Sequence, residues 1–217
     1  ALLHFNEYLG ELFGRPSWPD ELASLERPEV LDALARLLGV SEFLWDDFLR
    51  MQYANLFPVV ANVDTLAAAR SCAELAAALA ANLENGQAGT GDWRDALNAF
   101  KDREMFRIDM RHILGHVPAY ADFARELTDL AEVVLAAAVE RCHAELAAQY
   151  GMPEPGRYCL AALGKAGGRE LGFASDIELM FVYEAAGNTA GPRVIGAGEF
   201  YEKLVVELTR AIRARRE

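Results

Sequence analysis

The sequence predicts an α+β protein in which an all-helical bundle, residues 1–150, precedes a smaller mixed domain, residues 151–217. Up to Tyr150 the apolar residues recur at the spacing of about 3.6 that is typical of amphipathic helices. After Gly151 this spacing gives way to short apolar runs bounded by glycine and proline, which are typical of strands and turns. The charge changes at the same point, with 12 basic and 24 acidic residues before residue 151 but 9 of each after it.

Helices are predicted in the first domain from apolar periodicity and from residues that begin or end helices. Gly39 ends the first helix, and Ser41 is a good N-cap for the second. Asp64 and Asp92 can cap the third and fourth, and Pro118 precedes the last. The predicted ranges are 29–38, 41–57, 65–83, 93–114 and 119–150. The fourth helix also carries cations that we interpret as a solvated or ion-paired face: Lys101, Arg103, Arg107 and Arg111.

The second domain reads as two strands, a glycine-rich turn between them and a final helix. Tyr158 to Leu163 is a short apolar run that predicts a buried strand. The turn follows at Gly164 to Gly168, and a second strand is predicted from Asp176 to Tyr183. Apolar residues from Phe200 to Ile212 lie at helical spacing and predict an amphipathic helix.

Composition narrows the classes of partner. A hydrophobic content of 53% with 25% charged residues indicates a globular protein, and a net charge of −12 argues against non-specific binding to nucleic acid or an anionic membrane. No apolar run of about 18 residues and no signal-peptide pattern occurs, so we expect no membrane span. The chain begins at Ala1 rather than Met, which leads us to expect a piece of a longer protein. Cysteines far apart in the sequence predict reduced, buried thiols: Cys72, Cys142 and Cys159.

Two carboxylates at the start of the second predicted strand are candidate metal ligands. Asp176 and Glu178 are two residues apart, and on a strand such residues share a face. Carboxylates held together repel unless a cation lies between them, and Mg²⁺ prefers oxygen ligands and keeps substrate phosphates as others. The glycine turn upstream lets backbone N–H groups approach a phosphate. The combination favours metal-assisted phosphoryl or nucleotidyl transfer.

Each of these features has an ordinary structural explanation when taken alone. A Gly-Gly pair is most often only a turn, and an Asp-x-Glu sequence is most often a solvated strand face. The combined spacing of Gly167, Gly168 and Asp176 is more specific than either. The turn is not a P-loop, because Lys165 precedes the glycine pair and no Lys-Ser or Lys-Thr follows it.

The segment Gly167-Gly168, seven further residues and Asp176-Ile177-Glu178-Leu179 resembles the signature of the DNA polymerase β-like nucleotidyltransferase superfamily. The longer string from Gly164 to Leu179 is similar to the bifunctional glutamine synthetase adenylyltransferase/adenylyl-removing enzymes. Further similarity occurs at residues 100–108, 130–132 and 147–151.

This resemblance implies a nucleotidyltransferase fold whose mixed sheet is truncated at the C-terminus of this chain. It implies that Asp176 and Glu178 are catalytic and hold Mg²⁺ or Mn²⁺, with ATP or ADP as substrate or product. The residues it assigns to nucleotide phosphates are Gly167, Gly168, Ser175 and Arg169. It also implies a cytoplasmic enzyme with glutamine synthetase as its partner and the PII signalling protein as a second one.

Two departures from the family pattern lower the activity that we expect of this chain. The second carboxylate of the family is usually Asp, whereas this chain has Glu178, and the third carboxylate belongs to a later strand that residues 1–217 do not include. We therefore expect this fragment to be weakly active or inactive.

The family carries two nucleotidyltransferase domains: one transfers AMP from ATP to a tyrosine of glutamine synthetase, and the other removes it by phosphorolysis.

Arg-Glu-Leu after the glycine pair and Ser-Asp-Ile before Glu178 favour the N-terminal, adenylyl-removing copy. Three alternatives stay open on the sequence: ATP-dependent adenylylation, a catalytically silent regulatory module on the same fold, and a nucleotidyltransferase that acts on another substrate.

Overall fold

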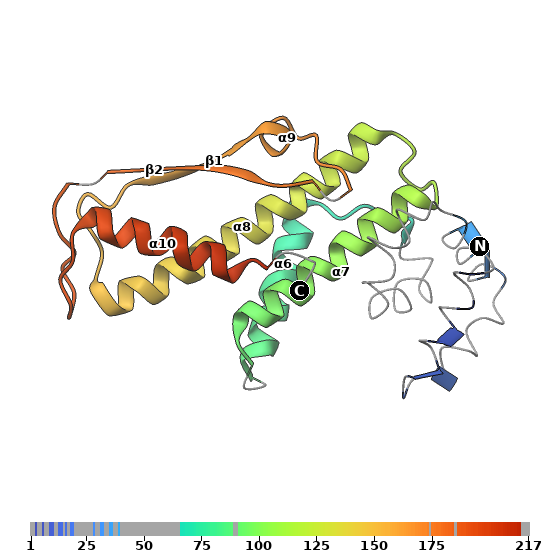
Figure 1. Ribbon diagram of the computed structural model, residues 1–217, viewed down its shortest axis with the longest axis horizontal. Coiled ribbons are helices and arrows are strands. Elements are labelled where there is room, and N and C mark those ends of the chain that lie inside the picture. The colour runs from blue at the N-terminus through green and yellow to red at the C-terminus, as the bar shows by residue number, and fades with distance from the viewer. Residues whose placement is uncertain are drawn as a thin grey trace. The chain divides into compact units, whose positions relative to one another are not determined.

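The computed structural model describes residues 66–88, 91–173, 175–184 and 186–213, together with isolated positions before residue 40 (Figure 1). The helices predicted at 29–38 and 41–57 lie largely outside the described residues. The described residues form a mainly helical α+β structure with one two-stranded sheet. Its elements are α6 (Cys72–Ala88), α7 (Trp93–Ile113), α8 (Tyr120–Tyr150), β1 (Tyr158–Leu163), α9 (Gly164–Gly167), β2 (Glu178–Tyr183) and α10 (Ala197–Ala211).

The described residues between 66 and 150 form helices and no strand, as predicted. Helix α6 begins later than the predicted Thr65 because Ser71 and Glu74 form a capping box. The Glu74 carboxylate accepts hydrogen bonds from the Ser71 amide and hydroxyl, both at 2.8 Å, and the Ser71 Oγ accepts one from the Glu74 amide at 3.3 Å. Such a pair satisfies amide groups that a helix start leaves without partners, and it fixes where the helix begins.

The chain divides into two compact units. One comprises residues 1–69 and 102–123, and the other comprises residues 70–101 and 124–215. The domain boundary predicted near residue 150 stays a prediction. No helix among the described residues is both long and apolar enough to cross a membrane.

In the first unit two arginines of α7 are buried. Arg107 and Arg111 are 6% and 3% exposed, so neither belongs to a solvated face, and for Arg107 the ion-paired alternative is confirmed. Arg107 is ion-paired, because its Nε donates to the Glu104 carboxylate at 2.8 Å. Arg111 donates instead to the carbonyl of Leu66, which is fully buried. Burial of a cation requires such partners. Glu104 lies three residues before Arg107 on the same helix, whereas Leu66 lies 45 residues before Arg111.

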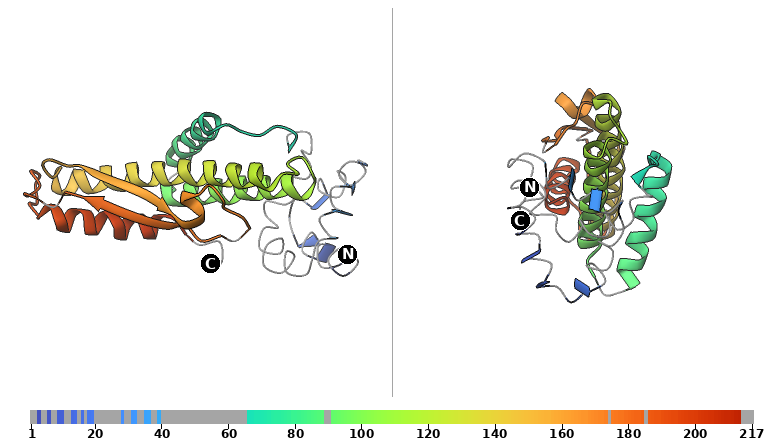
Figure 2. Two further views of the ribbon diagram at one scale, coloured as in Figure 1. Left: turned by 90° about the horizontal axis from the view of Figure 1, so that it is seen from above. Right: turned by 90° about the vertical axis from the view of Figure 1, so that its right-hand side faces the viewer.

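In the second unit the β1–β2 hairpin lies along α8 and α10 (Figure 1, Figure 2). Aromatic rings form the contacts, from Tyr158 to His143 of α8 and to Tyr201 of α10. The strands are antiparallel, with Tyr158 opposite Tyr183 and Leu163 opposite Glu178. The inner face of the hairpin contacts Tyr201 of α10, which is fully buried. Ring centroids of three hairpin aromatics lie 4.8–5.9 Å from that of Tyr201: Tyr183, Tyr158 and Phe181. The opposite face is open, and Leu163, Met180 and Val182 on it are 42%, 46% and 52% exposed.

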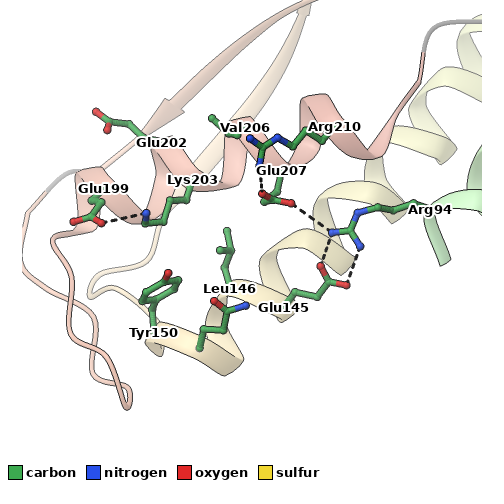
Figure 3. Close-up of a pocket in the computed structure, with 11 residues that line it drawn as sticks. Arg94, Glu145, Leu146, Tyr150, Glu199, Glu202, Lys203, Val206, Glu207 and Arg210 are labelled. Atoms are coloured by element: carbon green, nitrogen blue, oxygen red, sulfur yellow. Dashed lines mark hydrogen bonds and ion pairs between the residues drawn. The ribbon is translucent and has the colours of Figure 1, made fainter. Parts of the chain in front are cut away.

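In the same unit Arg94, at the start of α7, contacts side chains of both α8 and α10 (Figure 3). Its guanidinium lies 2.6 Å from a Glu145 carboxylate oxygen on α8 and 3.6 Å from one of Glu207 on α10. Trp93 donates its indole N–H to the other Glu145 oxygen at 2.6 Å. Desolvation acts to raise the pKa of Glu145, but the hydrogen bonds from Arg94 and Trp93 outweigh it, so that this pKa is lowered.

We expect the fold to lose stability as the pH falls, and His143 of α8 to account for part of this loss. His143 stacks on Tyr158 at 5.4 Å, and its Nε2 is buried without a hydrogen-bond partner among the described residues. Desolvation lowers its pKa, so below the ordinary histidine value of about 6.5 the unfolded chain binds the proton more readily. Above that pH both states are neutral and the effect vanishes.

The variant His143→Phe keeps an aromatic ring in place and removes the proton site. Its urea unfolding midpoint should change less than that of the wild type between pH 8 and pH 5.5, and at pH 8 the two proteins should be nearly equal in stability. Parallel pH dependence in the two proteins would show that His143 does not contribute.

Candidate functional site

The glycine turn closes directly on the end of β1. Gly164 follows the strand with φ of +52°, a left-handed conformation that favours glycine, and α9 makes a single helical turn. Three amides donate within the turn: Gly168 to the Gly164 carbonyl at 3.0 Å, Arg169 to Ala166 at 3.2 Å and Glu170 to Lys165 at 2.7 Å. These three amides are therefore already used within the turn, and a phosphate bound here would have to contact other groups of the turn.

The two glycines of the pair have different structural roles. A Cβ on Gly167 would lie 2.5 Å from the Ala162 carbonyl oxygen, closer than any real contact of that kind. A Cβ on Gly168 would have no neighbour nearer than 3.5 Å, which is ordinary contact. Gly167 is therefore needed to let the turn pack on β1, whereas the position of Gly168 can accept a Cβ without a clash.

Glu178 faces the glycine turn. It is the first residue of β2, opposite Leu163, and its carboxylate lies over Gly164, where an added Cβ would be 2.7 Å from Oε2. Asp176 is exposed and lies two residues before the strand, so the predicted strand start at Asp176 is wrong and strand alternation does not place it beside Glu178. In the described part of the chain neither carboxylate forms an ion pair. The Glu178 carboxylate beside the glycine turn is the kind of oxygen donor that a hard divalent cation requires.

The other two predicted nucleotide ligands make contacts within the protein. Ser175 holds the loop before Asp176, since its Oγ accepts from the Gly172 amide at 2.9 Å and its own amide donates to the Gly172 carbonyl at 3.2 Å. Arg169 forms ion pairs with Asp129 and Glu132 of α8. Sequence reasoning missed these two acids, although residues 130–132 belong to the segments that carry the resemblance.

A groove of about 640 Å³ lies between α8 and α10 and is distinct from the glycine turn (Figure 3). Its cations pair with glutamates of the same groove: Arg94 with Glu145, Lys203 with Glu199 at 3.3 Å, and Arg210 with Glu207 at 3.0 Å. Glu145 is 13 residues from Glu132, or about 20 Å along the axis of α8. The groove is thus a charge-paired helix junction some distance from Glu132, which contacts Arg169 of the glycine turn.

Comparison with known proteins identifies the family. The family described as glutamate-ammonia ligase adenylyltransferase matches residues 31–216. The chain belongs to this family, which confirms the resemblance found in the sequence.

Its relatives include proteins named bifunctional glutamine synthetase adenylyltransferase/adenylyl-removing enzyme. The one from Thioalkalivibrio sulfidiphilus is 33% identical over 186 residues, which is 83% of this chain and 19% of the relative. That from Mesorhizobium japonicum is 28% identical over 219 residues, covering 99% and 21%. That from Haemophilus ducreyi is 37% identical over 123 residues, covering 54% and 13%. The chain spans about a fifth or less of the length of these relatives.

The different surroundings of the two glycines make a direct prediction. Gly167→Ala forces the new methyl group against the Ala162 carbonyl and should lower the free energy of unfolding by about 1–3 kcal/mol. Gly168 has φ of −81° and ψ of −3°, which alanine adopts freely, so Gly168→Ala should be neutral or stabilise by at most about 1 kcal/mol. Urea unfolding of both variants measures the difference, and equal destabilisation would contradict the packing described for Gly167.

Proposed function

We propose that this chain contributes to metal-dependent nucleotidyl transfer on glutamine synthetase in the cytoplasm, and specifically to removal of AMP from the adenylylated enzyme by phosphorolysis. The observation that carries the proposal is the Glu178 carboxylate, which lies over the glycine turn without a cation partner among the described residues. Support comes from membership of an adenylyltransferase family and from relatives whose names include both adenylylation and adenylyl removal.

In this proposal the hairpin and the glycine turn are part of a nucleotidyltransferase sheet, and each predicted residue has a role. Asp176 and Glu178 would hold Mg²⁺ or Mn²⁺, which when bound offsets the negative charge of the phosphates. Gly167 and Gly168 would let the phosphates approach the backbone, and Ser175 would hold the loop that carries Asp176. Arg169, which is ion-paired with Asp129 and Glu132, would hold the turn in place.

The reaction transfers AMP from a tyrosine oxygen to inorganic phosphate. A phosphate oxygen attacks the phosphorus of the AMP group, the bond from that phosphorus to the tyrosine oxygen breaks, and ADP and a free tyrosine result. The tyrosine oxygen takes up a proton as it leaves. The phosphates of both reactants are anionic, and the neutral charge balance of residues 151–217 tolerates them better than the acidic residues before them.

The direction rests on Arg169-Glu170-Leu171 and on Ser175, Asp176 and Ile177, which resemble the N-terminal copy of the family. The alternatives are ATP-dependent adenylylation and a silent regulatory module. Glu178 favours the latter, because it stands where the family usually has Asp. The PII signalling protein is proposed as a partner on the resemblance alone.

Nucleotide binding should depend on Asp176. Magnesium with ADP should raise the melting temperature of this chain, because a ligand that binds only the folded state stabilises it. Asp176→Asn removes one charged oxygen donor and should abolish the increase. Glu154→Gln removes an exposed carboxylate elsewhere and should retain it. Loss of the increase in both variants, or in neither, would place the metal elsewhere.

The direction of transfer can be tested in the natural protein that carries this sequence. Adenylylated glutamine synthetase incubated with inorganic phosphate should yield ADP, and Asp176→Asn should reduce the rate by about a hundredfold or more, as is typical when a ligand of a catalytic site is removed. If Asp176→Asn leaves ADP formation intact but abolishes transfer of AMP from ATP, this domain is the adenylylating one.

A further inference from the structure

We propose that Arg169 is a positioning residue: together with Asp129 and Glu132 it fixes the glycine turn to α8, and it does not itself bind the nucleotide. The inference rests on the proposed function for its meaning in catalysis. The clamp between the turn and the helix can be tested without that function.

The backbone at Arg169 points to a residue held in place by its surroundings. Its φ is +57°, and among the described residues it alone combines a positive φ with a side chain larger than glycine's hydrogen. A residue with a Cβ rarely adopts this conformation unless neighbouring contacts impose it. The residue directly follows the Gly167-Gly168 pair, and its amide closes the turn on the Ala166 carbonyl at 3.2 Å.

The side chain of Arg169 supplies those contacts. Its Nη1 lies 2.5 Å from a Glu132 oxygen, and its Nη2 donates to Asp129. Asp129 and Glu132 are three residues apart on α8 and therefore share a face of that helix. A planar guanidinium that spans two carboxylates in this way fixes both distance and orientation. The carboxylates lie 40 and 37 residues before Arg169, so the contact joins the turn to a distant element.

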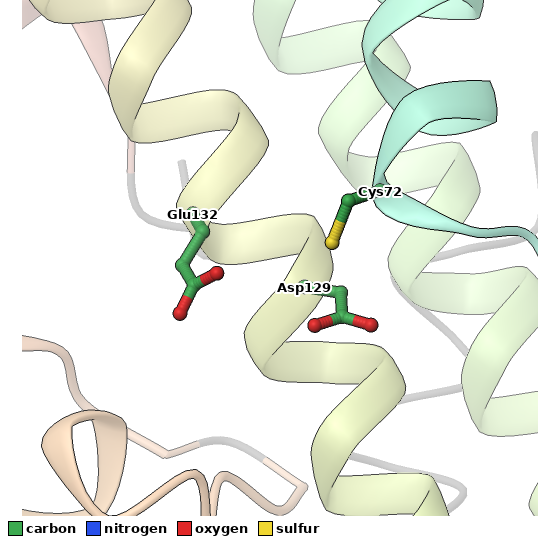
Figure 4. A group of neighbouring side chains, drawn as sticks. All are labelled: Cys72, Asp129 and Glu132. Atoms are coloured by element: carbon green, nitrogen blue, oxygen red, sulfur yellow. The ribbon is translucent and has the colours of Figure 1, made fainter.

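A third side chain, Cys72 at the start of α6, completes the cluster (Figure 4). The Cys72 sulfur and the carboxylate oxygens of Asp129 and Glu132 all lie within 4.8 Å of one another, a spacing that could also suit a metal ion. Desolvation, followed by a hydrogen bond to Asp129, raises the pKa of the Cys72 thiol. A protonated thiol is a poor metal ligand, and the guanidinium of Arg169 already balances the charge of the acids. The cluster is therefore assigned to Arg169 and not to a metal.

These contacts set the distance between the turn and the carboxylates of the site. The Glu178 carboxylate lies over Gly164, four residues before Gly168, so a shift of the turn changes its place relative to Glu178. Phosphate transfer is sensitive to displacements of about 1 Å at the reacting groups. The two carboxylates of α8 already balance the positive charge of Arg169, so that little of it is left to attract a phosphate.

The test compares three variants of this chain: Arg169→Ala, the double variant Asp129→Asn with Glu132→Gln, and their combination. If Arg169 acts by positioning, the first two should each weaken affinity for magnesium–ADP by about tenfold, and the combination should be no worse than either. Arg169→Lys should restore little, since it lacks the planar fork. Arg157→Ala removes an exposed ion pair with Glu184 and is the matched control, with affinity unchanged.

Direct phosphate binding by Arg169 gives the opposite result and would overturn the proposal. In that case Arg169→Ala would weaken affinity, while the carboxylate variant would leave it unchanged or tighten it.

Hydrogen exchange of the Gly168, Arg169 and Glu170 amides tests the contact between the turn and α8 separately from the proposed function. Exchange there should accelerate in Arg169→Ala and in the carboxylate variant but not in Arg157→Ala. If the wild type does not respond to magnesium–ADP, the proposed function fails, and the exchange rates still decide whether the clamp exists. Unchanged exchange in both variants would disprove the clamp.

Discussion

The ion pair between Arg94 and Glu145 is the contact on which the second unit depends. It ties the start of α7 to α8, and through Glu207 it also ties both helices to α10. Arg94 is 19% exposed, so part of the charge lies out of water, and the indole N–H of Trp93 completes the hydrogen bonding of Glu145. With α8 and α10 held side by side, their aromatic side chains form the surface on which the hairpin packs. The hairpin in turn positions the glycine turn.

One face of the hairpin packs against the helices and stabilises the fold, and the other face is accessible to solvent. Tyr158 and Phe181 turn inward, stack at 5.5 Å and contact Tyr201. Glu178, Met180 and Val182 alternate with them and are exposed. The carboxylate that faces the glycine turn therefore belongs to the solvent-accessible face, so the packing that stabilises the sheet does not cover it. A site for phosphate chemistry needs this separation, because its carboxylates must remain reachable by substrate.

The sequence predicted those elements that are determined by residues close together in the chain. Apolar spacing was sufficient for α7 and α8, and the start of α6 could have been found from the Ser71 and Glu74 capping box. The apolar run predicted the position of β1, but its prediction as a buried strand is wrong, because both ends of the strand are exposed. The burial of Arg111 was not predictable, because its acceptor is the carbonyl of Leu66, 45 residues earlier. For the site, the motif indicated the turn and both carboxylates. It could not reveal that Arg169 contacts α8, since periodicity within one segment contains no information about partners 37 and 40 residues away.

Asn98 has a consequence for how the chain folds. Its side-chain amide donates to the Ala211 carbonyl at 2.8 Å, and its side-chain oxygen accepts from the Arg213 amide at 2.9 Å, contacts across 113 and 115 residues. Loop closure of this length costs entropy before it is rewarded, and folds rich in such distant contacts form slowly. During synthesis on the ribosome, α7 emerges long before α10. The Asn98 side chain also donates to the Arg94 carbonyl at 2.7 Å, but its contacts with Ala211 and Arg213 cannot form until more than a hundred further residues have been synthesised. The second unit therefore closes late in translation.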